Sequence, residues 1–270
     1  MSNLRVRSMA LVLLVALAAV PAFATHSWGG YHWARTANPL VLKVGDNMTT
    51  ATWKVDLGVA IADWDRSGVL ALTVIPGQAK GRCRPTAGRD EVCNDTYGFN
   101  GWLGLAQIWL SSSHISQGIA KMNDSYSMNL AEKQHVICQE IGHTFGLAHQ
   151  SEDGSSQNTC MDYYQNKSDT DTTSTHPNQH DYDELAIIYA HLDSFNSAFG
   201  IGGNLSTLSM PVVDGDDLEQ PWHWGNPVAF DAAGRANVFV LDRGDGDKVI
   251  TRVVWTDDAK TDRPARDTRQ

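Results

Sequence analysis

The chain lacks an apolar run long enough to cross a membrane, and its longest apolar run lies at the N-terminus. Arg5 and Arg7 precede an apolar stretch at residues 9–20, and Ala22-Phe23-Ala24 has the small-x-small form of a cleavage site. This order predicts a secretory signal peptide over residues 1–24. The alternative is a membrane anchor, but the twelve apolar residues fall short of the ~20 that span a bilayer. We therefore expect a secreted, extracellular protein with no membrane partner after signal cleavage.

The chain is also poor in basic residues, with 21 Lys and Arg against 31 Asp and Glu and a formal net charge of −10. Removal of residues 1–24 would take away two arginines and no acid, which makes the charge −12. A balance this acidic argues against nucleic acid or an anionic membrane as partner. The rest of the chain suffices for one catalytic domain and a small appendage, with no internal repeats. We expect a monomer.

The most informative stretch runs from Gln139 to His149. On a helix, Gln139 and His143 lie one turn apart on one face, with roughly 5–6 Å between their Cβ atoms, so both side chains can converge on one metal ion. Glu140 is rotated by about 100° and could hold a water at the metal without being a ligand. Gly146 can adopt a positive φ and end the helix, and the turn would bring in His149 as a third ligand.

Apart from its first residue, this stretch has the long zinc-protease pattern H-E-x-x-H-x-x-G-x-x-H, and it resembles the metzincin metallopeptidases. The resemblance covers about residues 28–195. It implies an α/β (α+β) metzincin-like catalytic domain at residues 25–198, with a twisted mixed sheet, an edge strand over the cleft, a zinc helix, a Met-turn and a C-terminal helix. We expect residues 199–207 to be a linker and residues 208–270 a small β-rich C-terminal extension.

Gln139 stands where the family has a histidine. An amide coordinates zinc only through its carbonyl oxygen, which is a weaker donor than imidazole. Two interpretations follow. One is an active zinc metalloendopeptidase that holds Zn²⁺ with Gln139, His143 and His149; the other is a catalytically inactive, secreted protein-binding module. A peptidase that prefers another metal is a third possibility. His135 is a poor substitute ligand because it lies about 12 Å along the helix axis from His143.

The first interpretation implies protein or peptide substrates, and the resemblance assigns a role in peptide hydrolysis to each site residue. Zinc would lower the pKa of a water toward 7, and Glu140 would take the proton and return it to the leaving amine. Met161-Asp162-Tyr163, twelve residues after His149, resembles the Met-turn, in which the methionine forms an apolar floor under the zinc. Tyr163 matches the tyrosine that astacins and serralysins use as a movable ligand and oxyanion partner. An ordinary packed tyrosine is the alternative.

Four cysteines permit three disulfide pairings. We favour Cys83–Cys93, which closes a loop rich in Gly, Arg and Asp, and Cys138–Cys160. Because Cys138 directly precedes Gln139 and Cys160 directly precedes Met161, the second bridge would join the metal helix to the segment beneath the metal.

Hydrophobic periodicity predicts the remaining elements. The metal helix should begin near Asn129, with Leu130, Ile137 and Ile141 on its buried face. By the resemblance, residues 101–110 form the sheet edge that pairs with substrate, and an interior strand is the alternative from composition. The other elements are strands at 39–44 and 69–75, helices at 55–64 and 181–192 (with Leu192 on the buried stripe), and β runs at 227–230, 236–241 and 249–255, the last two joined by a turn at 244–247.

Overall fold

The computed structural model describes residues 26–78, 83–198, 218 and 220–256. The predicted signal peptide at residues 1–24 and the predicted linker at residues 199–207 lie outside the described residues. Among the helices of the described part, none has the length and apolar character needed to cross a membrane.

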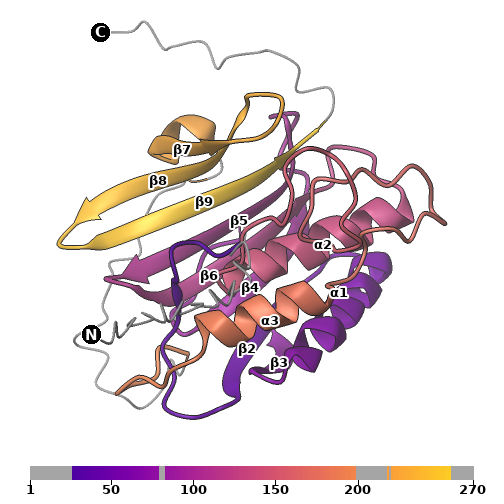
Figure 1. Ribbon diagram of the computed structural model, residues 1–270. Helices are drawn as coiled ribbons and strands as arrows, with labels where there is room; N and C mark the ends of the chain where they lie inside the picture. The colour runs from indigo at the N-terminus through magenta and orange to yellow at the C-terminus, as the bar shows by residue number, and fades with distance from the viewer. Residues whose placement is uncertain (1–25, 79–82, 199–217, 219, 257–270) are drawn as a thin grey trace, which may run out of the picture.

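The described chain forms a mixed nine-stranded sheet, and three α-helices lie together against one side of it (Figure 1). The strand order is β3-β2-β4-β6-β5-β9-β8-β7, and β1 pairs with β6 outside this path. The strands are β1 (His32–Trp33), β2 (Leu40–Asn47), β3 (Leu70–Pro76), β4 (Arg89–Asp95), β5 (Trp102–Ser111), β6 (His114–Asn123), β7 (Asn226–Phe230), β8 (Ala236–Gly244) and β9 (Asp247–Trp255). The helices are α1 (Ala51–Trp64), α2 (Leu130–Thr144) and α3 (Gln179–Ile188). The predicted α+β class with a mixed sheet is confirmed.

The predicted strand, helix and strand at the start of the domain are present as β2, α1 and β3. Helix α1 begins four residues earlier than its hydrophobic pattern indicates, because the side chain of Thr50 caps it by accepting a hydrogen bond from the backbone N–H of Trp53. β2 and β3 are parallel, and α1 supplies the crossover connection that a parallel pair needs.

The prediction that residues 101–110 form an edge of the sheet is wrong. β5 pairs with β6 on one side and with β9 on the other, from Trp102 opposite Trp255 to Leu110 opposite Lys248. Nine of its ten residues are buried, which is typical of a strand covered on both faces. The three predicted β runs near the C-terminus are present as β7, β8 and β9, but they extend the main sheet and are no separate appendage. Gly244 pairs with Asp247 at the predicted turn.

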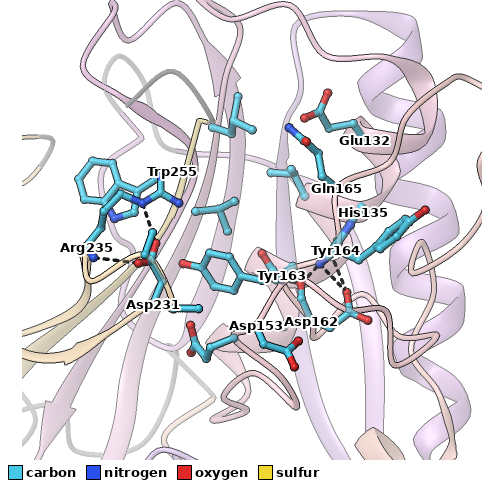
Figure 2. A pocket seen from close by; sticks show the side chains of 18 residues that line it. Glu132, His135, Asp153, Asp162, Tyr163, Tyr164, Gln165, Asp231, Arg235 and Trp255 are labelled. Carbon is cyan, nitrogen blue, oxygen red and sulfur yellow. Dashed lines mark hydrogen bonds and ion pairs between the residues drawn. The ribbon is translucent and has the colours of Figure 1, made fainter. Parts of the chain in front are cut away.

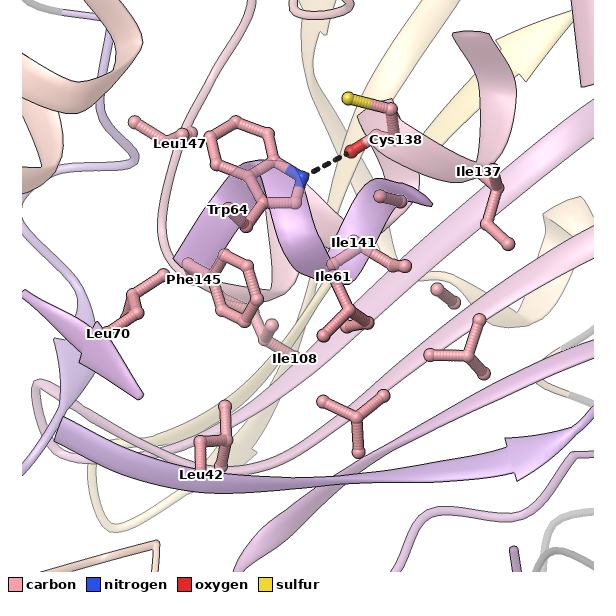
Figure 3. Close-up of a cluster of buried hydrophobic side chains, with 14 of the residues drawn as sticks. Leu42, Ile61, Trp64, Leu70, Ile108, Ile137, Cys138, Ile141, Phe145 and Leu147 are labelled. Carbon is pink, nitrogen blue, oxygen red and sulfur yellow. Dashed lines mark hydrogen bonds between the residues drawn. The ribbon is translucent and has the colours of Figure 1, made fainter. Parts of the chain in front are cut away.

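The main apolar core fills the space between the sheet and the helices (Figure 3). Within it, the indole Nε1 of Trp64 in α1 donates a hydrogen bond to the carbonyl of Cys138 in α2 over 3.0 Å, so the two helices are fixed at the level of the metal motif. A second cluster on the far side of β5 joins Trp102 and Leu105 to Trp224, Phe239 and Val253. Burial of both faces of β5 therefore depends on the C-terminal strands.

Two predicted buried positions are exposed. Leu130 has 53% of its surface accessible because it is the first residue of α2 and precedes the part that packs on the sheet. Leu192 is 57% exposed because α3 ends at Ile188, four residues before the predicted helix end. The predicted partners Ile137, Ile141, Leu185 and Tyr189 are buried.

Candidate metal centre

Helix α2 carries the first part of the site into the core. Asn129 caps it by accepting a hydrogen bond from the N–H of Glu132, and every residue from His135 to Thr144 is buried. Helix α2 packs against β5 and β6, so its metal-motif side chains lie beside the centre of the sheet. After the helix, Gly146 has a φ of 102°, a conformation that only glycine adopts without strain. The chain then turns back and places His149 beside His143.

The two motif histidines face each other through their Nε2 atoms, which are 2.9 Å apart. Nδ1 of His143 lies 2.8 Å from the carbonyl oxygen of Leu147. Since a carbonyl only accepts, that nitrogen carries the proton and Nε2 carries the lone pair. Burial, together with the neighbouring His149 and Arg252, lowers the pKa of His143 well below its ordinary value. Neutral imidazole with a fixed tautomer is the form that binds a metal.

His149 has a similar acceptor on its other nitrogen. Its Nδ1 lies 3.0 Å from Oε1 of Glu152, and donation to this carboxylate leaves Nε2 free. A tetrahedral zinc with bonds of about 2.0–2.1 Å separates two ligand atoms by roughly 3.3 Å, which is close to the spacing of the two Nε2 atoms. A carboxylate behind a ligating imidazole is a common arrangement at zinc sites. The histidine pair therefore fits a zinc ion.

Gln139 is buried on the same helix, with 1% of its surface exposed. Its amide nitrogen donates to the carbonyl of Asp162 over 2.7 Å, which leaves the amide oxygen as the atom that a cation would use. Both ring nitrogens of His135 are occupied by the oxygens of Asn166 and Asp162, at 2.9 and 3.1 Å. These contacts give His135 a structural role, in keeping with its exclusion as a substitute ligand. Ligation by Gln139 remains a prediction.

Glu140 is fully buried, and neither of its carboxylate oxygens has a hydrogen-bond partner among the described residues. Burial raises the pKa of Glu140 well above its ordinary value, and the charge of Arg252 partly opposes this. Gly104 in β5 leaves room for the side chain, because a Cβ there would lie 2.3 Å from Oε1. Buried polar atoms without a partner are rare in folded proteins. A buried carboxyl without a partner, three residues before His143 on the same helix, is a candidate for proton transfer at a metal held there.

The segment around Met161 lies against the same helix. The structure pairs Cys138 with Cys160, whose Cα atoms are 5.9 Å apart, and Cys83 with Cys93. This is the pairing favoured from the sequence. Met161 is fully buried, and a Cβ at Gly142 would come within 2.6 Å of its sulfur. The methionine therefore packs directly against the helix at Gly142.

The ring of Tyr163 lies 4.6 Å from that of His149, in an edge-on arrangement. Its hydroxyl donates to the carbonyl of Val253 over 3.0 Å and accepts from the amide of Asn237 at 3.2 Å. Both partners belong to the C-terminal strands. Tyr163 therefore stands beside the site, with its hydroxyl held by β8 and β9.

Two residues at the site were missed by the sequence analysis. Arg252, on β9, places Nη1 2.8 Å from Nδ1 of His149 and 3.3 Å from Oε1 of Glu152, and its guanidinium lies over the ring of Trp28. Glu152 could have been noticed as an acid three residues after His149. No local pattern marks Arg252, because strand pairing alone brings it there.

A cavity of about 220 Å³ opens beside this centre (Figure 2). Tyr163 and Tyr164 line one side of it, and Asp231 and Arg235 from the β7–β8 connection lie with Trp255 of β9 on the other. Gln139 and Glu152 also belong to the lining. The ion pair between Arg235 and Asp231, at 2.7 Å, holds the second group together. The C-terminal segment thus forms one wall of the cavity, and Gln139 is the residue of the metal motif that lines it.

Comparison with known proteins finds no matching protein family and no similar curated sequence. Among solved structures, the chain is similar to myroilysin, with 12% identity and a TM-score of 0.34 over 58% of this chain and 96% of that one. It is also similar to high choriolytic enzyme 1, a hatching enzyme zinc-protease from the medaka fish Oryzias latipes. The identity there is 9% and the TM-score is 0.35, over 59% of this chain and 94% of that one.

Proposed function

We propose that this protein is a secreted zinc-dependent metalloendopeptidase. The observation that carries the proposal is that the Nε2 atoms of His143 and His149 lie 2.9 Å apart, at the end of the helix that also carries the buried and unpartnered carboxyl of Glu140. The amide oxygen of Gln139 would be the third ligand. Two disulfides in one chain are typical of exported proteins.

Bound zinc would supply a polarised water and a Lewis acid for the peptide carbonyl. Glu140 would accept a proton from the attacking water and pass it to the leaving amine. Its raised pKa suits the first step, because a carboxylate with a higher pKa is a stronger base toward the water. The carbonyl of Leu147 and the carboxylate of Glu152 would keep the two imidazoles oriented. The hydroxyl of Tyr163 would donate to the oxyanion after leaving Val253.

The substrate would be a protein or peptide, and it would enter through the cavity beside Tyr163. At about 220 Å³, that cavity is smaller than the roughly 300–1,000 Å³ that encloses a typical small ligand. An extended peptide also finds no free edge on β5. Peptide binding would therefore require displacement of the C-terminal strands that form the cavity wall.

A catalytically inactive protein-binding module is the second candidate function. The same occupation of β5 by β9, and the contact of Arg252 with His149, favour it. The retained carboxyl of Glu140 has no role in such a module, and it is costly to bury without a partner. We therefore place the enzyme first.

Metal content and hydrolysis of casein, measured on the same purified samples, test the proposal. We expect the wild type to hold a zinc ion that His143→Gln removes, and to cleave casein. Glu140→Gln should retain that zinc and lose turnover at least a hundredfold, within the range that general acid–base catalysis supplies. Asp183→Asn, which removes an exposed carboxylate on α3 outside the cavity lining, serves as the matched control and should change neither quantity. A wild type that binds no His143-dependent zinc and cleaves nothing would support the binding module.

A further inference from the structure

A second group of imidazoles surrounds one carboxylate away from the metal motif. His32 comes from β1, His114 begins β6, and His191 and Asp193 follow α3. Nε2 of His114 and Nε2 of His191 lie 3.1 and 3.4 Å from Oδ1 of Asp193, and Nε2 of His32 lies 3.5 Å from Oδ2. The parallel pairing of β1 with β6 sets His32 directly opposite His114. Three segments that are distant in the sequence therefore meet here.

The donor atoms of His32, His114 and Asp193 are spaced as a metal polyhedron requires. A tetrahedral zinc with bonds of about 2.0–2.1 Å has ligand atoms roughly 3.3 Å apart. Nε2 of His114 and Nε2 of His191 lie 3.1 and 3.4 Å from one carboxylate oxygen, Oδ1, whereas His32 lies 3.5 Å from the other, Oδ2. One donor atom each from His32, His114 and Asp193 can be chosen with all separations within 4.8 Å. His191 stands beside them, with its ring 4.7 Å from that of His32.

Asp193 is held in place independently of the histidines. Its backbone N–H donates to the carbonyl of Arg35 over 2.7 Å, and its Oδ2 accepts the backbone N–H of Arg35 over 2.9 Å. One oxygen is thus committed to the backbone, while Oδ1 points toward the imidazoles of His114 and His191. A carboxylate oriented in this way is a preformed ligand.

His32 supplies the observation that points to a ligand. The residue is buried, with 4% of its surface exposed, and its Nδ1 lies 2.8 Å from the carbonyl oxygen of Gly30. Because a carbonyl only accepts, Nδ1 must carry the proton and Nε2 must carry the lone pair. That Nε2 is buried without a hydrogen-bond partner and faces Asp193. A neutral imidazole with a backbone carbonyl behind it is the usual form of a metal-bound histidine.

We propose that His32, His114, His191 and Asp193 form a second zinc site, distinct from the centre on α2. Three imidazoles and one carboxylate suit Zn²⁺, and four protein ligands would complete a tetrahedron. Because no coordination position is then left for water or substrate, such a site would stabilise the fold and would not catalyse a reaction. It fastens the N-terminal strand β1 and the start of β6 to the segment after α3, and its zinc binds with folding.

A metal-free alternative uses the same contacts, since protonated histidines can pair with Asp193. One carboxylate balances one positive charge, so three imidazoles around it gain little from being charged together. The two accounts differ in a measurable quantity, because hydrogen-bonded histidines bind no stoichiometric zinc.

The test counts zinc in the full secreted chain after passage over a chelating resin. We expect two zinc ions per wild-type chain, one in His114→Gln, one in His143→Gln, and none in the double variant. Cobalt substituted into His143→Gln should give the intense visible absorption of a tetrahedral site, and His114→Gln should abolish it. His191→Ala, which changes the most exposed of the four ligands, should weaken zinc binding in the His143→Gln background at least tenfold without unfolding the chain.

His176→Gln is the matched control, since His176 also pairs with an aspartate, Asp63, but in isolation from other histidines. It should leave both zinc ions in place. Loss of all zinc on His143→Gln alone, or two ions retained in His114→Gln and Asp193→Asn, would overturn the second site. A failure of the proposed peptidase centre gives a different result, namely a single zinc that depends on His114 and not on His143.

Discussion

Nη1 of Arg252 lies 2.8 Å from Nδ1 of His149, although 103 positions separate the two residues in the chain. An arginine N–H only donates, so this contact requires the lone pair of His149 on Nδ1 and its proton on Nε2. Glu152, 3.0 Å from the same Nδ1, requires the opposite tautomer. Only the tautomer that Glu152 selects presents Nε2 to a metal. Arg252 and Glu152 therefore have opposing effects on the proposed zinc centre.

Replacing Arg252 with leucine should tighten zinc at the His143-dependent site about tenfold, because the competing donor is removed and Glu152 alone orients His149. Competition with a chromophoric chelator measures the change. Arg235→Leu is the control, because Arg235 pairs with Asp231 and does not contact His149. Weaker zinc binding in Arg252→Leu than in Arg235→Leu would contradict the opposing role of Arg252.

Replacing Glu152 with glutamine should weaken the same zinc about 10–100-fold, the usual effect of losing the acceptor behind a ligating imidazole. The reason is that a neutral amide holds the Nδ1 proton of His149 less strongly than a carboxylate does. The same competition assay reports the result. Asp153→Asn removes the neighbouring negative charge without touching His149, and an equal loss in both variants would mean that only overall charge matters.

Gln139→His should tighten zinc binding and keep or raise peptidase activity, because imidazole is a better donor than an amide oxygen at the same helical position. Gln139→Ala should release zinc to chelator more readily than the wild type. Time courses of zinc loss, combined with casein hydrolysis, distinguish the two variants. If the wild type has neither zinc nor activity and Gln139→His gains both, the natural protein is a binding module.

The disulfide between Cys138 and Cys160 should contribute about 2–4 kcal/mol to the free energy of unfolding. Replacing both cysteines with alanine should lower urea stability by that amount and also weaken zinc binding, because Met161 is no longer fastened to the helix. The double replacement of Cys83 and Cys93 is the control. It should lower stability and leave zinc affinity unchanged, since that bridge is distant from the metal motif in sequence and lies in another apolar cluster.

Asp90 should make stability depend on pH. Its carboxyl is fully buried, and Thr144 donates to it over 2.7 Å; burial raises the pKa of Asp90 from 3.8 to about 8. Between these values the folded chain keeps a proton that the unfolded chain has lost, so folding stability falls as pH rises from about 4 to about 8 and is then level.

Asp90→Asn removes this titration and keeps an acceptor for Thr144. Its free energy of unfolding, measured in urea relative to the wild type, should therefore rise between pH 4 and pH 8. The upper bound is about 6 kcal/mol, because each tenfold change in the proton-binding constant corresponds to roughly 1.4 kcal/mol. A difference between the two proteins that is constant with pH would show that Asp90 does not titrate in this range.

Local sequence determined the parts of the molecule that depend on neighbouring residues. The spacing of Gln139, Glu140 and His143 places these side chains because helical periodicity depends only on backbone dihedrals. Gly146 turns the chain toward His149 because glycine alone adopts its positive φ freely. The hairpin turn at residues 244–247 was predictable for the same reason.

Tertiary structure decided which strand lies beside β5 and which side chains complete each site. The apolar sequence of β5 fits an edge or an interior strand equally well, and only its pairing with β9 settles that it is interior. The same pairing brings Arg252 to His149, and the pairing of β1 with β6 brings His32 to His114. These contacts join residues far apart in the chain. They form only when the strands that carry them pair, so no local sequence pattern predicts them.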